Sequence, residues 1–310
     1  MFSRARQFKF VPGDYRDEAP AIGCDGLVPG ASLDLTHWQG NRTPLAFKAD
    51  TSTEIALKFV AAPESARWAG AVVVNNHFDT DGALSVWTLL DPEQAQENRE
   101  LLVAAAEAGD FDEWPGDDRG LWLDAAIRAL AASARDDAEA YATVLPQLLD
   151  LLSALDRRRD LWEAEWDQLQ AAVRASESGA IQIERRGACG LARHAPGQSE
   201  APGPLLARRL LPGSLRYLLA FDQGGGTFLY RYERPRYAWA ETIVRPACLA
   251  PEASSLATSL GPDWTSDDLL GLTGLVQTRR PIEIPPDALL TLLAQVDPLP
   301  TGESTSTPRS

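Results

Sequence analysis

The chain has 310 residues and a mass of 33.6 kDa, enough for two domains with a sizeable core. Its 44 acidic residues exceed its 29 lysines and arginines, for a net charge of −15, and no basic run is present, so duplex nucleic acid is not an expected partner. No apolar run approaches the roughly 20 residues of a membrane-spanning helix, which excludes an integral membrane protein.

The N-terminal segment MFSRARQFKFVPG lacks the apolar stretch of a secretory signal. The three cysteines, Cys24, Cys189 and Cys248, are far apart and form no C-x-x-C pair, which excludes a disulfide framework and a thiolate zinc site. We therefore expect a cytoplasmic protein that does not engage a membrane.

The first third of the chain has the pattern of an α/β domain. Segment 33–38 (LDLTHW) predicts a short strand that runs into a loop, and 50–62 predicts a helix capped by Thr51 or Ser52. The β-branched run at 71–74 (AVVV) predicts a strand buried on both faces, and 83–90 predicts the helix that follows. Strand, polar loop and helix in this order place a site at the carboxyl end of a parallel sheet.

The middle of the chain is predicted to be helical. Asp91 is an expected N-cap before Pro92, and Gly109 is expected to end that helix. Further helical patterns cover about 120–134, 138–155 and 157–176.

Beyond residue 179 the pattern is mixed. Strands are predicted at 181–186, 215–222 and 227–233, with Gly224 to Gly226 as a hairpin tip between the last two. Helices are predicted to start within 265–275 and to cover 284–296. The expected division is a metal-site α/β domain at 1–115, a helical section at 116–178, a smaller α+β domain at 179–298 and a disordered tail at 299–310.

The segment His77-Phe-Asp79-Thr-Asp81-Gly82 concentrates polar side chains directly after the buried strand. Alternation in an extended loop turns His77, Asp79 and Asp81 to one side, which suits Mn²⁺, Mg²⁺ or Zn²⁺. The competing interpretation is an Asx-turn with a helix cap, in which the two carboxylates only satisfy backbone amides.

The sequence H-F-D-T-D-G-A-L-S resembles the first motif of the DHH phosphoesterases, H/D-x-D-x-D-G. The resemblance implies that His77, Asp79 and Asp81 bind a pair of divalent cations, usually manganese. It covers roughly residues 20–110.

A second segment, T-H-W-Q-G-N followed by S-T-E, resembles the namesake Asp-His-His-x-x-Asn motif of that family and its helix start. The resemblance implies that His37 is a metal ligand and that Asn41 is the family's site asparagine. Thr36 replaces the namesake aspartate, and Trp38 replaces the histidine that contacts phosphate in relatives.

The two motifs stand in reversed order, which a circular permutation would explain. On the permuted layout Asp25 matches the metal-bridging aspartate best, with Asp34 as the alternative. The remaining family aspartate is sought in GDFDEWPGDDRG; the candidates are Asp110, Asp112 and Asp118.

The resemblance implies a hydrolase that acts on a small phosphorylated compound or short oligonucleotide through a two-cation, manganese-preferring site. Its catalytic residues would be His37, Asn41, His77, Asp79 and Asp81. Two alternatives remain: a non-catalytic binding or scaffold protein that retains the fold, favoured by Trp38, and another metal-dependent reaction such as amide hydrolysis. The oligomeric state is left open.

Arginines in the C-terminal part admit two interpretations: they clasp an anionic substrate between domains, or they line a solvated strand face. His194 is expected in a surface loop. The arginines concerned are Arg231, Arg234, Arg236 and Arg245.

Overall fold

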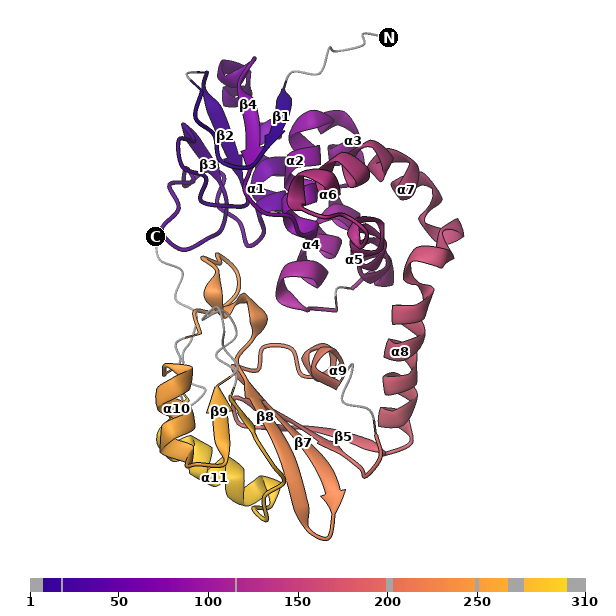
Figure 1. Ribbon diagram of the computed structural model, residues 1–310, viewed down its shortest axis with the longest axis vertical. Coiled ribbons are helices and arrows are strands. Elements are labelled where there is room, and N and C mark those ends of the chain that lie inside the picture. The colour runs from indigo at the N-terminus through magenta and orange to yellow at the C-terminus, as the bar shows by residue number, and fades with distance from the viewer. Residues whose placement is uncertain are drawn as a thin grey trace. The chain divides into compact units, whose positions relative to one another are not determined.

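The chain is an α/β protein with two compact units. The computed structural model describes residues 8–17, 19–114, 116–198, 203–248, 251–266 and 276–299, and Figure 1 follows the elements along the chain. Unit 1 contains Met1–Trp166 and Ala240–Pro246, and unit 2 contains Asp167–Trp239 and Ala247–Ser310. Because Ala240–Pro246 rejoins unit 1 after a long excursion of the chain, we call it the return segment.

Unit 1 is built on a fully parallel sheet with the order β1-β4-β2-β3. Its central strands β2 and β4 are short and apolar, and Ile22 of β2 pairs with Val73 of β4 on one side and Leu33 of β3 on the other. The strands are β1 (Lys9–Pro12), β2 (Ala21–Cys24), β3 (Leu33–Leu35) and β4 (Val72–Asn75).

Alternate residues of these strands point to opposite faces. Ile22 and Val73 belong to a large core shared with the helices, whereas Ala21 and Val74 pack under loops. The helices are α1 (Ser52–Ala61), α2 (Thr80–Leu90), α3 (Pro92–Glu97), α4 (Arg99–Phe111), α5 (Asp118–Ala131), α6 (Asp137–Val144), α7 (Leu148–Ala154) and α8 (Arg159–Glu177), with 3₁₀ turns at Pro63–Trp68, Leu145–Gln147 and Leu155–Arg157.

The division of the chain differs from the expected 1–115, 116–178 and 179–298. Leu35 of the sheet and Trp162 of α8 lie in one hydrophobic core, so the helices as far as Trp166 pack with the parallel sheet instead of forming their own section. Helix α8 runs from unit 1 into unit 2.

Three helix boundaries refine the predictions. The predicted cap of α1 is confirmed, since the Thr51 hydroxyl accepts from the Glu54 amide. Helix α2 begins before residue 83, because Asp79 caps it by accepting from Gly82. Gly109 does not end a helix: α4 runs through it, and a Cβ there would lie 2.9 Å from Thr80 Cβ, so this glycine allows close packing.

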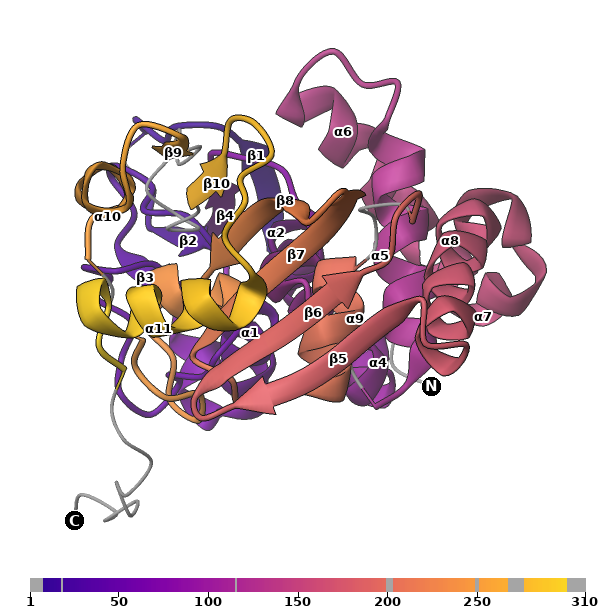
Figure 2. The same ribbon diagram turned by 90° about the horizontal axis from the view of Figure 1, so that it is seen from below.

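Unit 2 is a mixed six-stranded sheet with the order β5-β6-β7-β8-β10-β9, in which β6 and β7 are parallel and the other pairs antiparallel. Leu219 packs with Ala207 of α9 on one face, and Leu218 packs with α10 and α11 on the other (Figure 2). The elements are β5 (Ile181–Arg186), β6 (Cys189–His194), α9 (Gly203–Leu210), β7 (Arg216–Gly224), β8 (Thr227–Glu233), α10 (Ala253–Leu260), β9 (Trp264–Ser266), β10 (Val276–Thr278) and α11 (Pro286–Val296), with a 3₁₀ turn at Arg236–Trp239.

Two predictions for unit 2 have clear outcomes. The expected surface-loop position of His194 is wrong: it ends strand β6, is only 2% exposed and lies 4.5 Å from the Phe221 ring. The glycine hairpin tip is confirmed, since Gly224, Gly225 and Gly226 all have positive φ, which an L side chain would strain.

Other predictions fall partly on residues that the structure does not describe. Thr265 and Ser266 lie in β9, and the rest of the helix start predicted at 265–275 is outside the described residues. The disordered tail predicted at 299–310 is outside them from residue 300 onward. Among the described residues, no helix combines the length and apolar character needed to cross a membrane. All three cysteines are buried and free.

Candidate metal centre

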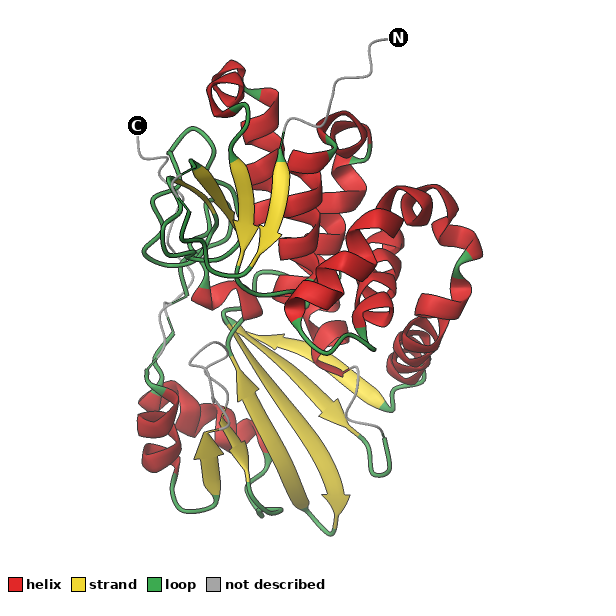
Figure 3. Cartoon of the chain, turned by 45° about the horizontal axis from the view of Figure 1, so that its top comes forward, coloured by secondary structure: helices red, strands yellow, loops and turns green. Residues whose placement is uncertain are grey.

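The polar residues of interest gather at the carboxyl edge of the parallel sheet, where Figure 3 shows the strand arrowheads pointing the same way. Asp25 directly follows β2, and His37 follows β3 by two residues. The loop after β4 carries His77 and Asp79, and Asp81 lies in the first turn of α2. Ligand sites of α/β sheets form at this edge.

The first cluster consists of Asp25, His37, Asp81 and Asp110, with side chains no more than 6% exposed. The Nε2 atom of His37 lies 3.0 Å from Asp110 Oδ2, 3.6 Å from Asp25 Oδ1 and 3.8 Å from Asp81 Oδ2. One imidazole and three carboxylates that converge in this way match the ligand preferences of Mn²⁺, Mg²⁺ and Zn²⁺.

The second cluster consists of Asp25, His77 and Asp79. His77 Nε2 lies 3.0 Å from Asp25 Oδ2 and 3.2 Å from Asp79 Oδ2. His77 is 27% exposed and Asp79 41% exposed, so this cluster, unlike the first, is open to solvent.

Asp25 belongs to both clusters and divides its carboxylate between them. Oδ1 faces His37 and Oδ2 faces His77, and neither buried oxygen has a hydrogen bond within the described residues. The backbone of Asp25 adopts φ 57°, a left-handed conformation that costs free energy for a residue with a side chain. Buried carboxylate oxygens without hydrogen bonds are costly, and each of these two oxygens could be satisfied by a metal ion.

The start of helix α1 holds Asp81. Its two oxygens accept from the backbone amides of Ser52 and Thr53, each at 2.7 Å. The positive end of the helix stabilises the carboxylate, and each oxygen keeps a lone pair for a cation.

His37 is oriented through its other ring nitrogen. Nδ1 lies 2.6 Å from the main-chain oxygen of Asp50. Because a carbonyl oxygen only accepts, Nδ1 carries the proton and Nε2 is the atom turned toward the carboxylates. A histidine that ligates a metal is commonly fixed in this way.

The carboxylates change the protonation of both histidines. Burial alone would lower the pKa of His37, but the neighbouring Asp110, Asp81 and Asp25 outweigh it and raise the pKa to about 10. Burial is likewise outweighed at His77, whose two carboxylate neighbours raise its pKa to about 11. Without a cation, protonated imidazoles supply the positive charge in this site.

The carboxylates differ from one another. Burial, followed by repulsion from Asp25, raises the pKa of Asp81 to about 7, and burial raises that of Asp110 well above its ordinary value. Burial would also raise the pKa of Asp25, but His77 and His37 outweigh it and lower the pKa to about 2. Asp25 is therefore the most firmly ionised of these three carboxylates.

The structure chooses between the aspartates that the sequence left open. Asp25 lies in both clusters, whereas Asp34 pairs with Arg42 at 3.1 Å. Asp110 joins the first cluster, while Asp112 is the left-handed C-cap of α4. The third candidate, Asp118, accepts from the indole nitrogen of Trp114.

Helix capping and cation binding are both possible uses of the H-F-D-T-D-G loop, and one residue serves both. Asp79 Oδ1 caps α2 through Gly82, while its Oδ2 faces His77. The two interpretations of this loop are therefore compatible.

Asn41 is engaged by its own loop instead of by the clusters. Its Nδ2 donates to the Trp38 carbonyl at 2.7 Å and to Glu241 Oε2 at 3.0 Å, and its Oδ1 accepts from the Thr43 amide. These contacts stabilise the loop that carries His37, and they do not connect Asn41 to either cluster.

Thr36 and Trp38, which differ from the DHH motif that this segment resembles, have distinct positions. The Thr36 hydroxyl donates to the Asp25 carbonyl at 3.0 Å and so helps to hold the strained Asp25 backbone. Trp38 lies next to the more exposed cluster, with its ring 5.4 Å from that of His77.

Two supporting residues carry no sequence signal of their own. Asp50 contacts His37 through its main chain, which any residue offers. Tyr141 of α6 donates to the His77 carbonyl at 2.9 Å and accepts from Asn75 Nδ2 at 2.8 Å. Only the folded chain brings these residues to the site.

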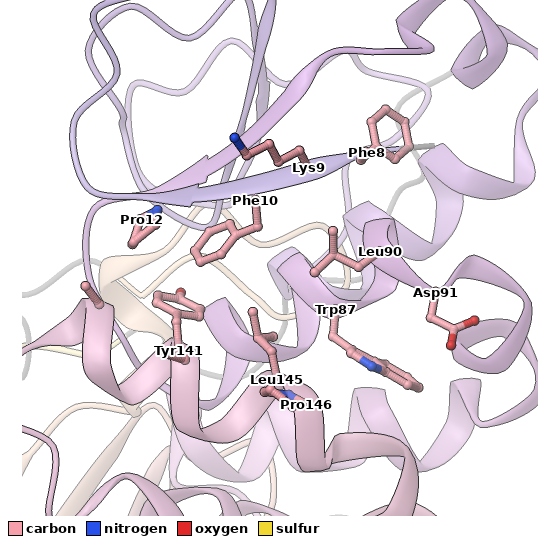
Figure 4. Close-up of a pocket in the computed structure, with 12 residues that line it drawn as sticks. Phe8, Lys9, Phe10, Pro12, Trp87, Leu90, Asp91, Tyr141, Leu145 and Pro146 are labelled. Carbon is pink, nitrogen blue, oxygen red and sulfur yellow. The ribbon is translucent and has the colours of Figure 1, made fainter. Parts of the chain in front are cut away.

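Tyr141 also lines a cavity of about 480 Å³ that is separate from the clusters. Figure 4 shows Phe10, Trp87, Tyr141 and Leu145 around it, with Lys9 and Asp91 also at its wall. The walls are mainly apolar, so this cavity does not have the chemistry of a phosphate site, and the acidic clusters remain the candidate centre.

Comparison with known proteins assigns no activity. No curated protein matches the sequence significantly. A family model described as a family of unknown function, DUF6687, matches residues 6–269, which include both clusters and the return segment. Since the match covers most of the chain, the protein belongs to the DUF6687 family.

Proposed function

We propose that this protein is a metal-dependent phosphoesterase-like hydrolase with two divalent cations, manganese in preference to magnesium or zinc. The observation that carries the proposal is the divided carboxylate of Asp25, with Oδ1 toward His37 and Oδ2 toward His77. The resemblance of the loop His77–Gly82 to the DHH phosphoesterase motif supports the same reaction class.

The two positions would have different ligands. Asp25, His37, Asp81 and Asp110 would hold the buried cation, and Asp25, His77 and Asp79 the exposed one. A cation pair lowers the pKa of a bound water and neutralises phosphate oxygens in the transition state.

The chain's own residues supply position and charge. Asp81 is held by the α1 amides and His37 by the Asp50 carbonyl, so both are preorganised. The exposed position, next to His77 and Asp79, is where a substrate phosphate has access from solvent.

The substrate would be a small phosphorylated compound or a short oligonucleotide. Trp38 beside His77 offers a flat apolar surface to a base or sugar ring, although it cannot supply the positive charge of the histidine expected in relatives. The net charge of −15 disfavours a long polyanion.

The test is hydrolysis of a chromogenic aryl phosphodiester and phosphomonoester by metal-stripped protein with added Mn²⁺. Asp79→Asn keeps a helix cap, because asparagine caps as well as aspartate, but removes a cation ligand. Asp112→Asn is the matched control, since asparagine tolerates its φ of 47°. We expect turnover in the wild type and the control and its loss in Asp79→Asn; no Mn²⁺-dependent turnover in the wild type rejects the proposal.

A binding or scaffold role is the second candidate. Trp38 favours it, because it stands where the DHH motif has a histidine that contacts phosphate, and an indole carries no positive charge. This role predicts Mn²⁺ binding without turnover on esters of either class. Hydrolysis of amides but not esters would instead indicate another reaction in the same site.

A further inference from the structure

We propose that the return segment is a working part of the metal centre, in which Arg245 acts as a positioning residue for His37 and Asp110. This inference concerns the same site as the proposed function. It begins from the distance in sequence: the return segment lies about 200 residues after His37, yet it contacts the loop that carries this histidine.

The return segment first fixes the main chain around His37. The Glu241 amide donates to the His37 carbonyl at 2.7 Å, and Ala240 forms an antiparallel bridge with Trp38. Glu241 also accepts from Lys48 Nζ at 2.6 Å. The loop with His37 is thus held against the return segment by an isolated bridge and the hydrogen bond beside it.

The return segment then fixes Asp50, the residue whose carbonyl orients His37. The Asp50 carboxylate accepts from the backbone amides of Ile243, Val244 and Arg245 and, at 2.7 Å, from Arg245 Nη1. Burial would raise the pKa of Asp50, but these donors lower it. Four donors from one segment leave the Asp50 peptide little freedom to turn away from Nδ1 of His37.

Arg245 also holds the end of α4, which carries Asp110. Its guanidinium contacts Glu107 Oε1 at 2.8 Å and Glu113 Oε2 at 2.6 Å. The Cζ atom of Arg245 lies 4.7 Å from the centre of the Phe111 ring. The side chain is only 15% exposed, so these ion pairs are poorly screened.

Arg245 therefore joins the two elements that meet at the buried cluster. One of them presents His37 and the other Asp110, whose ligand atoms are 3.0 Å apart. One interpretation of the sequence was that Arg245 binds an anionic substrate. Its contacts do not support that role, since its guanidinium pairs with three carboxylates of unit 1.

The experiment compares wild type, Arg245→Met, Arg245→Lys and Asp50→Asn. Arg135→Met is the matched control, because Arg135 precedes α6 and forms one exposed ion pair, with Glu139 of that helix. Two readouts are used: the hydrogen-bonded His37 Nδ1 proton in ¹⁵N-histidine spectra of metal-free protein, and calorimetric titration with Mn²⁺.

We expect Arg245→Met to lose the protected Nδ1 resonance and to weaken one Mn²⁺ event by about 10- to 100-fold while the other event is kept. Arg245→Lys should restore the resonance in part, and the control should match the wild type. If Arg245→Met fails to fold, Asp50→Asn must show the same selective loss, because it removes the charge but keeps the carbonyl.

The inference is overturned if Arg245→Met keeps the His37 Nδ1 resonance and both Mn²⁺-binding events. It is also overturned if Arg245→Met weakens both events equally. If the wild type binds Mn²⁺ without hydrolysing esters, the proposed function fails, but the two readouts still decide the role of Arg245. If it binds no Mn²⁺, the resonance alone decides.

Discussion

The Oδ2 atom of Asp25 lies 3.0 Å from Nε2 of His77, while Oδ1 of the same carboxylate faces His37 at 3.6 Å. One buried carboxylate thus connects a buried cluster to an exposed one. This arrangement explains why the left-handed backbone of Asp25 is tolerated, since it directs each oxygen to a different imidazole.

The two positions should be separable by mutation. Asp110→Asn removes a ligand of the buried cluster only, because Asp110 does not belong to the cluster of His77 and Asp79. We expect Mn²⁺ titration to show one event instead of two. Asp118→Asn is the control, since asparagine can still accept from Trp114; loss of both events in Asp110→Asn would contradict independent positions.

Mn²⁺ affinity should rise with pH. The pKa values of His37, about 10, and His77, about 11, mean that each cation displaces an imidazole proton near neutral pH. The apparent affinity should increase about tenfold per pH unit for each displaced proton. Titrations between pH 6 and 8 in buffers of different ionisation enthalpy measure the protons released, and a pH-independent affinity would refute the assignment.

The metal-free protein should lose stability as the pH rises. His37 has an ordinary pKa of 6.5 and a folded pKa of about 10, so its stabilisation is complete below pH 6.5 and disappears as the pH approaches 10. Thermal unfolding across this range should give a falling midpoint. In His37→Gln the unfolding midpoint should decrease less with pH than in the wild type. An equal decrease in that variant would mean that other groups cause the loss of stability.

Tyr141→Phe should destabilise the protein by about 1–3 kcal/mol, because Asn75 Nδ2 then loses a buried partner. The same change frees the His77 carbonyl, so Mn²⁺ binding at the exposed position should weaken more than at the buried one. Urea unfolding and calorimetry measure these effects. Phe10→Leu, on the same cavity, tests packing without loss of a hydrogen bond.

Gly109→Ala should destabilise the protein by about 1–3 kcal/mol, although alanine favours helices. The added Cβ would lie 2.9 Å from Thr80 Cβ and from Asp124 Oδ1. Thermal unfolding of this variant beside Ala108→Gly separates the clash from helix propensity, and a stabilised Gly109→Ala would show that the backbone relaxes.

Local patterns predicted the parts of the site that depend on short segments. The strand before residue 77 follows from its β-branched run, and the loop with His77, Asp79 and Asp81 from the polar segment after it. Capping chemistry limited the start of α1 to Thr51 or Ser52, of which the structure has Thr51. Asp25 was selected by the resemblance alone, which in permuted order requires an aspartate upstream of His37; the structure adds that it directly follows β2 and lies 3.6 Å from His37.

The remainder depends on contacts that no local pattern encodes. Asp110, Asp112 and Asp118 lie in one short acidic segment, and nothing in their local sequence distinguishes them as ligands. Only the length and direction of α4 decide which one reaches His37. Arg245 reaches Asp50 because the chain returns to unit 1, which periodicity does not report. His194 was misplaced because CGLARH lacks a strand's apolar alternation and gains its place by pairing with β7.

The most direct test of a bridged two-cation centre is Mn²⁺ titration of metal-stripped Asp25→Asn beside wild type and Asp34→Asn. Asp34 is also buried but pairs with Arg42 outside the clusters. The bridging assignment predicts two events in the wild type and in Asp34→Asn, and severe weakening of both in Asp25→Asn. Two undiminished events in Asp25→Asn, or none in the wild type, would contradict it.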